Sequence, residues 1–296
     1  MADKKSLFDE EFLKKLEYLY LVSKKVFSGK VQAQTRSKKI GWGMEFADHR
    51  DYNPGDDLRY LDWSLYGRME QLVTKLFHEE ENLNVYFLLD ATRSMDYVFP
   101  TKFDYARKVV AALAYVALAN LDTVDILPFG KDLAPTSLAG VRGKGNILKI
   151  FDFLQGIETV KATDMDATVR NFCARTKSKG LVVLISDFFD DKGYEKPLKT
   201  LHFAGHDISA ICVHHFWEAF PKYRGNVQFT DAETGRNQII NISKGLLKQY
   251  EKEYNRYIEH LKSTSGGLHC TFVNTLTDTP FEELILSVFR QGRFVK

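Results

Sequence analysis

The residues best suited to chemistry in this sequence follow the apolar stretch that begins FLLDATRSM at Phe87. The stretch ends in Asp90, and hydroxyl side chains follow at alternate positions, Thr92 and Ser94. Carboxylate and hydroxyl oxygens are hard ligands that suit magnesium, calcium or manganese. We therefore interpret this loop as part of a site for a divalent cation, with magnesium as the expected ion.

Two further residues are predicted to complete the site. Asp187 ends a second apolar run, VVLISD, and Thr163 lies at the entrance to a predicted helix, where a threonine is either an N-cap or a ligand. Ligands of an open parallel sheet bind beyond the carboxyl ends of its strands, where the strand order reverses, so Asp90 and Asp187 are expected at one edge. Four nearby carboxylates are alternatives to this assignment: Asp164, Asp166, Asp190 and Asp191.

The expected chemistry is binding and not bond cleavage. Asp90 and Asp187 would neutralise a divalent cation, and the hydroxyl ligands would add no charge, so the ion stays attractive to a carboxylate of a partner protein. These motifs contain no histidine or lysine that could act as a general base, so we predict no enzymatic activity and no catalytic residues.

Two alternatives stay open. In a structural domain with an unoccupied metal site, the same residues would only cap helices and hold the loop. A magnesium-dependent phosphohydrolase is the other alternative, since DATRS resembles the haloacid dehalogenase pattern Asp-x-Asp-x-Thr, but Thr92 stands where the second aspartate belongs. The segment GVRGKGN also lacks the first glycine and the final Ser or Thr of a phosphate-binding loop.

The elements that must position these residues alternate between buried strands and helices from Asn84 onward. Continuous apolar strands separated by helices predict an α/β fold, a doubly wound and mostly parallel sheet with helices on both faces. The expected strands are NVYFLLD, TVDILPFG, GLVVLISD, DISAICVHH and GLHCTFVN, with an edge strand near 133–138. The expected helices cover about 104–120, 146–154, 164–177, 196–203, 243–263 and 280–290.

Two features lie outside this alternation. An amphipathic helix is predicted over about 7–27, and a hairpin is predicted near 226–242, inserted before the long helix that follows it. We expect residues 1–81 to form an N-terminal region with this helix and an irregular wrapping segment, and residues 82–296 to form the main domain.

The wrapping segment, EFADHRDYNPGDDLRYLDW, alternates arginines with aspartates around a predicted type II turn at Asn53-Pro54-Gly55. Bidentate bonds between arginine and carboxylate can fix an irregular loop. We expect Trp42, Tyr52 and Trp63 to anchor it, although a direct role in partner binding stays open.

The totals exclude several other classes of protein. The chain has 296 residues, 44% hydrophobic and 27% charged, with a net charge of +2, which does not indicate a nucleic-acid or membrane surface. Its three cysteines form no CxxC pair and are expected as buried free thiols. The N-terminus lacks the apolar core of a signal peptide, so we expect a cytoplasmic protein.

The motif DATRSM, the threonine of KATD and the aspartate of ISDFF together resemble the metal-ion-dependent adhesion site of von Willebrand factor type A domains. In that family an Asp-x-Ser-x-Ser loop, a threonine and an aspartate hold the ion, and here Thr92 replaces the first serine but keeps the hydroxyl. The resemblance implies a doubly wound fold, with a divalent cation, usually magnesium, held by Asp90, Thr92, Ser94, Thr163 and Asp187.

The segment from Gly41 to Met95 also resembles a family called domain of unknown function fifty-eight, and the later TDAETG hairpin fits that family too. Its members join an arginine-aspartate segment to a type A-like domain and are commonly encoded beside MoxR-type AAA+ ATPases. The resemblance implies that such an ATPase, or its client, is the protein partner, in the assembly or activation of protein complexes. Many members carry membrane segments, and none is visible in this sequence.

Overall fold

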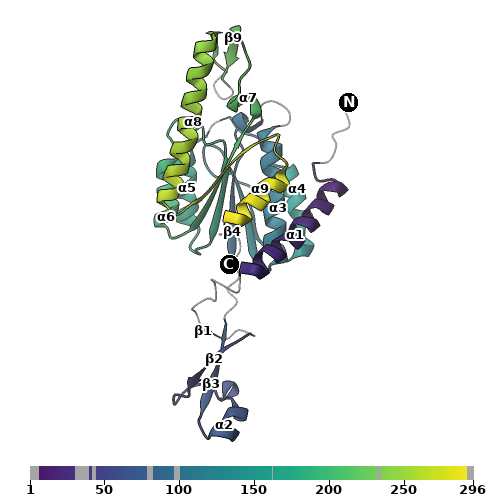
Figure 1. Ribbon diagram of the computed structural model, residues 1–296, viewed down its shortest axis with the longest axis vertical. Helices are drawn as coiled ribbons and strands as arrows, with labels where there is room; N and C mark the ends of the chain where they lie inside the picture. The colour runs from purple at the N-terminus through teal and green to yellow at the C-terminus, as the bar shows by residue number, and fades with distance from the viewer. Residues whose placement is uncertain are drawn as a thin grey trace. The chain divides into compact units, whose positions relative to one another are not determined.

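The computed structural model describes residues 7–30, 40–41, 45–78, 83–96, 101–161, 163–231 and 235–291 (Figure 1). The packing divides the chain into two compact units. The larger unit comprises the chain up to Val26 together with Leu83 onward, and the smaller unit runs from Phe27 to Asn82.

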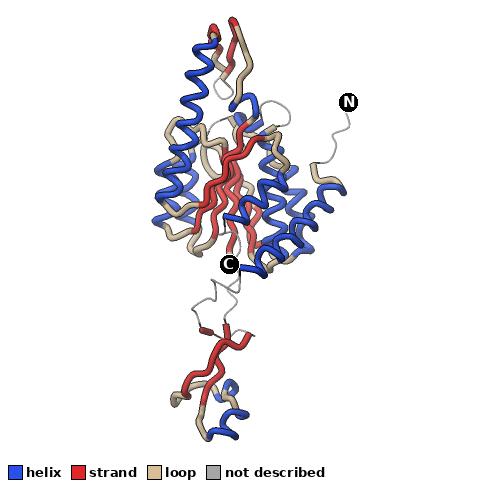
Figure 2. The backbone as a smooth tube through the Cα atoms, viewed as in Figure 1, coloured by secondary structure: helices blue, strands red, loops and turns tan. Residues whose placement is uncertain are grey.

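The larger unit is built around a six-stranded sheet in the order β11-β8-β7-β4-β5-β6 (Figure 2). All neighbours pair in parallel except the edge strand β6, which is antiparallel to β5. The strands are β4 (Asn84–Asp90), β5 (Thr123–Phe129), β6 (Leu138–Val141), β7 (Leu181–Ser186), β8 (Asp207–His214) and β11 (Thr271–Leu276).

Helices cover both faces of this sheet (Figure 1). On one face, α5, α6 and α8 pack against the strands, and α3, α4, α9 and the first helix lie on the other. The helices are α1 (Glu10–Lys30), α3 (Lys102–Ala119), α4 (Ile147–Gln155), α5 (Met165–Arg175), α6 (Glu195–Phe203), α7 (Phe216–Ala219), α8 (Lys244–Gly267) and α9 (Phe281–Gln291). The predicted doubly wound, mostly parallel α/β fold is confirmed.

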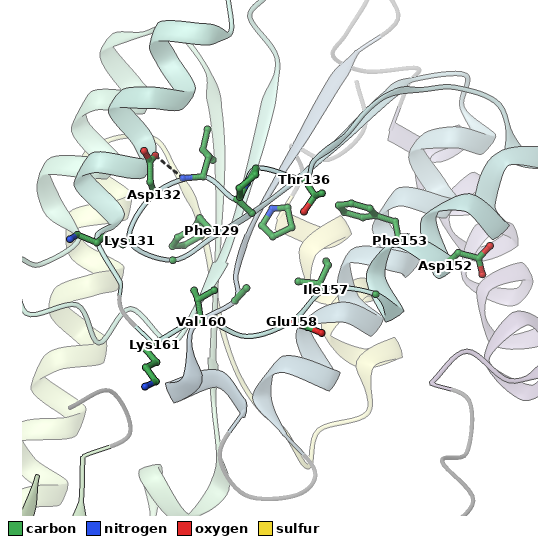
Figure 3. Close-up of a pocket in the computed structure, with 17 residues that line it drawn as sticks. Phe129, Lys131, Asp132, Thr136, Asp152, Phe153, Ile157, Glu158, Val160 and Lys161 are labelled. Carbon is green, nitrogen blue, oxygen red and sulfur yellow. Dashed lines mark hydrogen bonds between the residues drawn. The ribbon is translucent and has the colours of Figure 1, made fainter. Parts of the chain in front are cut away.

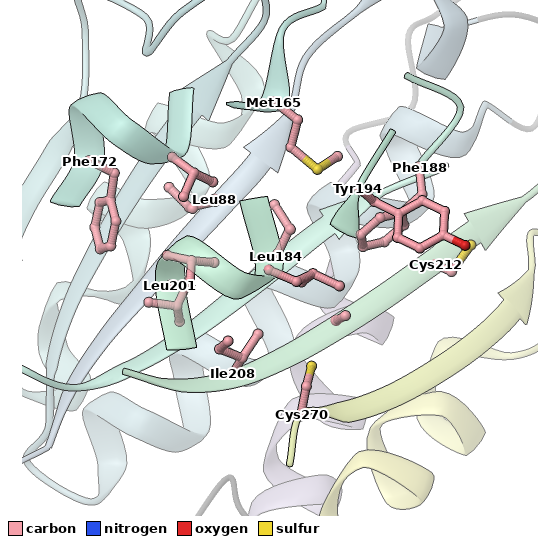
Figure 4. Packing of buried hydrophobic residues seen from close by; sticks show 14 of the residues in the cluster. Leu88, Met165, Phe172, Leu184, Phe188, Tyr194, Leu201, Ile208, Cys212 and Cys270 are labelled. Atoms are coloured by element: carbon pink, nitrogen blue, oxygen red, sulfur yellow. The ribbon is translucent and has the colours of Figure 1, made fainter. Parts of the chain in front are cut away.

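The apolar runs of the strands are continuous because both faces of the sheet are buried. Tyr86 and Leu88 of β4 pack with Phe172 of α5 and Leu201 of α6 in one hydrophobic cluster (Figure 4). Successive strand residues point to opposite faces, so Phe87, which is fully buried between them, faces the other layer of helices.

The first helix belongs with the sheet and not with the segment that follows it. Phe8, just before α1, stacks on Phe151 of α4 with ring centroids 4.5 Å apart, and Phe12 contacts Phe281 of α9 at 5.0 Å. The sequence division at residue 81 grouped this helix with the wrapping segment. Aromatic packing instead places the described part of α1 up to residue 26 in the larger unit.

The inserted hairpin is confirmed. Strands β9 (Gly225–Thr230) and β10 (Asn237–Ile242) pair antiparallel between α7 and α8, and the predicted turn residues 233–234 lie outside the described residues. The short helix α7 was not expected from the sequence. The predicted edge strand near 133–138 is displaced in the structure to Leu138–Val141.

The smaller unit contains more regular structure than the predicted wrapping segment. Three antiparallel strands, in the order β1-β3-β2, accompany a short helix. These elements are β1 (Ile40–Gly41), β2 (Glu45–Asp51), β3 (Val73–His78), the 3₁₀ turn Leu58–Tyr60 and α2 (Trp63–Met69). Because β2 carries charged residues along much of its length, it has no apolar run that would mark it as a strand.

The arginine-aspartate contacts of this unit are partly those expected. Arg50 donates to both carboxylate oxygens of Asp56 at 2.7 Å across the turn, where Gly55 has a φ of 109°. Asp62 instead caps α2 and pairs with His49 at 3.0 Å. The prediction of Trp63 as an anchor is wrong, since it is 61% exposed, and Trp42 lies outside the described residues.

The predictions for the cysteines and for membrane helices can be compared with the fold. Cys173, Cys212 and Cys270 are free thiols, the last two buried and the first partly so. Within the described part of the chain, no helix is long and apolar enough to cross a membrane.

Candidate metal centre

The order of the strands brings Asp90 and Asp187 to neighbouring positions. Strand β4 pairs with β5 on one side and with β7 on the other, and the chain reverses its direction of travel across the sheet between β4 and β7. Asp90 is the last residue of β4, and Asp187 directly follows the last residue of β7. Both carboxylates therefore lie at the switch point of the sheet, where doubly wound folds bind ligands.

The loop after β4 is organised around the Asp90 carboxylate, which is 2% exposed. Its Oδ1 accepts hydrogen bonds from the Thr92 backbone N–H at 3.0 Å and from the Thr92 hydroxyl at 2.7 Å. The Thr92 and Ser94 hydroxyl oxygens are 3.0 Å apart. The structure thus brings together the three side chains of the Asp-x-Thr-x-Ser motif.

Ser186 links the two strand ends and was missed by the sequence analysis. Its hydroxyl donates to Asp90 Oδ2 at 2.6 Å and accepts from the Phe188 N–H at 2.9 Å. Phe188, just after Asp187, has a φ of 59°, which a bulky residue rarely adopts, and its carbonyl accepts from the Tyr257 hydroxyl at 2.6 Å. A serine ending an otherwise apolar strand was the available sequence signal.

Thr163 lies in a segment that runs beside the same loop. Val160 exchanges backbone hydrogen bonds with Ala91 and Arg93, both at 2.8 Å, on either side of Thr92. The Asp164 N–H then donates to the Gly130 carbonyl after β5 at 2.9 Å. Between these fixed points, the Thr163 hydroxyl oxygen is buried and finds no hydrogen-bond partner among the described residues.

The nearby acids that could have replaced Asp187 have other partners or face solvent. Asp164 caps α5 and pairs with Lys192, so its interactions are local. Asp166 pairs through Oδ2 with Lys196 at 2.9 Å and with Arg170 at 2.8 Å, whereas its Oδ1 is buried and without a hydrogen-bond partner among the described residues. Asp190 accepts from the N–H groups of Met165 and Lys192, both at 2.8 Å, and Asp191 is exposed.

A buried lysine, Lys102, also enters the site and was not expected there. Its ammonium group lies 2.8 Å from Asp187 Oδ2 and 2.6 Å from Glu218 Oε1, and its side chain is 1% exposed. Lys102 is the first residue of α3, where the helix dipole disfavours a cation. Little in the sequence marked it, because Asp104, Arg107 and Lys108 follow in the same first turns of α3.

These charges shift the pKa values of one another. Burial raises the pKa of Asp90 above the ordinary carboxyl value, and the Asp187 carboxylate raises it further. Burial acts to raise the pKa of Asp187, but the Lys102 ammonium group and the Phe189 N–H together hold that pKa below the usual range. A nearby divalent cation would favour the ionised form of Asp90.

His214 and His215 have structural roles beside the centre. The ring of His214 is fully buried, with Nε2 3.0 Å from the Asp187 carbonyl oxygen and Nδ1 2.8 Å from the Tyr254 hydroxyl. His215 caps α7 by accepting from the Trp217 N–H at 3.1 Å.

The residues present fit a hard divalent cation better than a softer metal. Within the described ranges, no three His, Cys, Asp or Glu side chains gather as a metal site would require. The candidate centre instead combines two carboxylates with hydroxyl oxygens, a donor set that suits magnesium or manganese. The Thr163 hydroxyl oxygen, which is buried and finds no hydrogen-bond partner in the described part of the chain, is one feature that a cation would satisfy.

A hollow of about 720 Å³ adjoins the loop of the candidate centre (Figure 3). Ala91 and Val160, which flank the loop through the backbone bonds above, belong to its lining together with Phe129, Phe153 and Ile157. A partner that contacts the centre would therefore find an apolar depression beside it.

The doubly wound sheet, with this loop at its switch point, defines a von Willebrand factor type A-like α/β domain. The chain belongs to the family described as "Protein of unknown function DUF58", whose sequence profile matches residues 48–259. This confirms the family resemblance noted in the sequence.

Among curated proteins, the chain is 22% identical over 275 residues to "Uncharacterized protein Rv1480" of Mycobacterium tuberculosis, covering 91% of this chain and 86% of that protein. A Mycobacterium bovis protein, "Uncharacterized protein Mb1516", matches with the same values.

Among solved structures, BatB from Bacteroides thetaiotaomicron is 14% identical, with a TM-score of 0.44, covering 71% of this chain and 99% of that one. Proximal thread matrix protein 1 from the mussel byssus, in a structure titled "with zinc occupied MIDAS motif", is 14% identical with a TM-score of 0.44, covering 71% and 48% of the two chains.

Proposed function

We propose that this protein is a non-enzymatic binding module that uses a divalent cation, magnesium, to hold an acidic residue of a partner protein. The observation that carries the proposal is the hydrogen-bonded cluster of Asp90, Thr92 and Ser94 at the switch point. Thr163, whose hydroxyl oxygen is buried and without a partner among the described residues, follows Val160, which pairs with this loop. Asp90, Thr92, Ser94, Thr163 and Asp187 would hold the ion. When bound, the ion supplies an open coordination position that a carboxylate oxygen of the partner can fill.

The chain's own residues prepare this position. The Thr92 hydroxyl donates its single hydrogen bond to Asp90. Ser94 is therefore the donor in the contact between the Thr92 and Ser94 hydroxyls. Both hydroxyl groups are thereby fixed in orientation. Asp187 Oδ1 accepts only the Phe189 N–H, at 3.1 Å, among the bonds of the described residues, and retains a lone pair for a further contact.

The arrangement supports binding over hydrolysis. A phosphohydrolase would need Asp90 as an exposed nucleophile, but this carboxylate is buried, with Oδ1 accepting from Thr92 and Oδ2 from Ser186. Oδ2 keeps one lone pair, which can ligate a cation. Lys102 is held between two carboxylates and is not free to act as a base. We expect no magnesium-dependent turnover of generic phosphate esters, and turnover that disappears in Asp90→Asn would favour the enzyme instead.

Asp90→Ala tests the metal site directly. The substitution removes the carboxylate that organises the loop, so we expect it to abolish magnesium binding measured by calorimetry while the far-UV circular dichroism spectrum is retained. Asp132→Asn is a matched control, because Asp132 follows the neighbouring strand β5 but bonds to Asn171 and Leu133. Magnesium binding that is equal in wild type and Asp90→Ala would overturn the assignment.

The partner is proposed from the family resemblance and the site chemistry together. An ion with an open position favours an acidic residue, and the family context suggests a MoxR-type AAA+ ATPase. We expect a purified MoxR-type ATPase from the same organism to be retained by immobilised wild type in magnesium but not by Asp90→Ala. Equal retention of the ATPase by both proteins would show that the metal site is not the contact.

A further inference from the structure

Lys102 lies against the proposed metal ligands but is not one of the five ligand residues itself. Its ammonium nitrogen contacts the Asp187 and Glu218 carboxylates and lies 5.9 Å from the centre of the Phe189 ring. Because the Lys102 side chain is 1% exposed, it cannot reach water without breaking both ion pairs. The positive charge is therefore a fixed part of the centre.

Glu218 holds this lysine from the other side. Its Oε2 accepts the His215 N–H at 2.7 Å, and its backbone carbonyl accepts from the Tyr250 hydroxyl at 2.6 Å. The Glu218 side chain is nevertheless 33% exposed, whereas the Asp187 side chain is 4% exposed. Water screens Glu218 more than Asp187, so the electrostatic effect of Lys102 on the buried centre is only partly cancelled.

The charge balance of the proposed metal site follows from these contacts. Asp90 and Asp187 contribute two negative charges, which would neutralise a divalent cation. Lys102 offsets much of the Asp187 charge. A divalent ion bound here would keep a residual positive charge, and a carboxylate from outside the chain would neutralise it.

We infer that Lys102 sets the affinity and the specificity of the proposed metal site, by keeping its negative charge low enough that a partner carboxylate is needed to complete it. The inference rests on the proposed function and deepens it. It explains why the site would select an acidic partner over water or a neutral group. It also means that magnesium and the acidic partner bind cooperatively.

Magnesium titration by calorimetry, with magnesium alone as the probe, tests this inference. Lys102→Met removes the fixed charge, and we expect its magnesium affinity to be at least tenfold higher than that of wild type. Glu218→Gln removes the carboxylate that partly cancels the Lys102 charge, and we expect the magnesium affinity of this variant to be several-fold lower than that of wild type. Lys102→Arg keeps the charge and is expected to stay near the wild-type affinity.

The expected changes in magnesium affinity are opposite for Lys102→Met and Glu218→Gln, and this separates an electrostatic role of Lys102 from a structural one. Both Lys102→Met and Glu218→Gln break the same buried network, so a purely structural role would weaken magnesium binding in both. The double variant Lys102→Met/Glu218→Gln leaves no unpaired Glu218 charge, which guards against misfolding of the single variant. We expect it, too, to bind magnesium more tightly than wild type.

The outcomes distinguish this inference from the proposed function. If wild type binds magnesium but neither variant lacking Lys102 binds it more tightly, the role of Lys102 is overturned and the metal site stands. If wild type shows no binding while a variant lacking Lys102 binds, the inference is supported in its strongest form. If none of the proteins binds magnesium, both proposals fail together.

Discussion

Thr163→Val should stabilise the protein without magnesium and should weaken the stabilisation that magnesium provides. The Thr163 hydroxyl oxygen is buried and unpartnered among the described residues. A buried polar group without a hydrogen bond costs about 1–3 kcal/mol. Valine has nearly the same shape without the hydroxyl, so in a chelator we expect the variant to gain about 1 kcal/mol of unfolding free energy, or about 2–4 °C in Tm for a unit of this size.

Magnesium should cancel this gain. At a free concentration one hundred times its Kd, magnesium would stabilise the wild type by about 2.7 kcal/mol. If the loss of one ligand weakens binding tenfold, the same concentration stabilises Thr163→Val by only about 1.4 kcal/mol. The rise in Tm on adding magnesium should therefore be roughly halved in the variant.

Thermal unfolding followed by circular dichroism, in chelator and in magnesium, measures both effects. Thr168→Val is the matched control, because the Thr168 hydroxyl on α5 is also buried and unpartnered among the described residues but is not a proposed ligand. We expect the control to respond to magnesium as wild type does. If Thr163→Val also shows the full wild-type response to magnesium, Thr163 is not a ligand and the reasoning is refuted.

Two further predictions concern the scaffold. Burial raises the pKa of Asp122 to about 6, so its charged form destabilises the fold increasingly as pH rises from about 4 to about 6. Asp122→Asn removes this charge and can keep the hydrogen bond from the Leu83 N–H. In urea denaturation, we expect the variant to be more stable than wild type by about 1 kcal/mol at pH 7 but to differ little from it at pH 4. Equal effects at both pH values would contradict this. A Cβ at Gly180 would lie 2.2 Å from the Asn84 carbonyl oxygen, so Gly180→Ala should lower the unfolding free energy by more than about 2 kcal/mol in the same assay. Gly266→Ala, with open space around it on α8, is the control, and an equally stable Gly180→Ala would refute the clash.

The sequence was most informative for strands that are buried on both faces, because their residues form continuous apolar runs. Strands β4, β7 and β8 are covered on both faces, and their apolar runs predicted both their existence and their approximate ends. Because parallel strands place their carboxyl ends at one edge, the ends of two runs were enough to predict that Asp90 and Asp187 share that edge. Their direct adjacency follows from the pairing of β4 with β7, which the runs do not reveal.

The same logic failed where structure is built from exposed or polar residues. The three-stranded sheet of the smaller unit was read as an irregular wrap, because β2 shows no apolar periodicity. Trp63 was expected to anchor the wrapping segment, but the short helix α2 leaves it exposed. One-dimensional patterns report burial poorly in a small sheet, where little of each strand is covered.

By itself, the sequence determined the type of fold, the loop with its alternating oxygen side chains, and the edge of the sheet where they lie. Only the tertiary structure decided that Lys102 shares this centre, since it meets Asp187 and Glu218 from 85 and 116 positions away. Local propensity and hydrophobic pattern fix what each segment forms. The charge of a buried site depends on which segments converge there, and that is settled only when the helices pack onto the sheet.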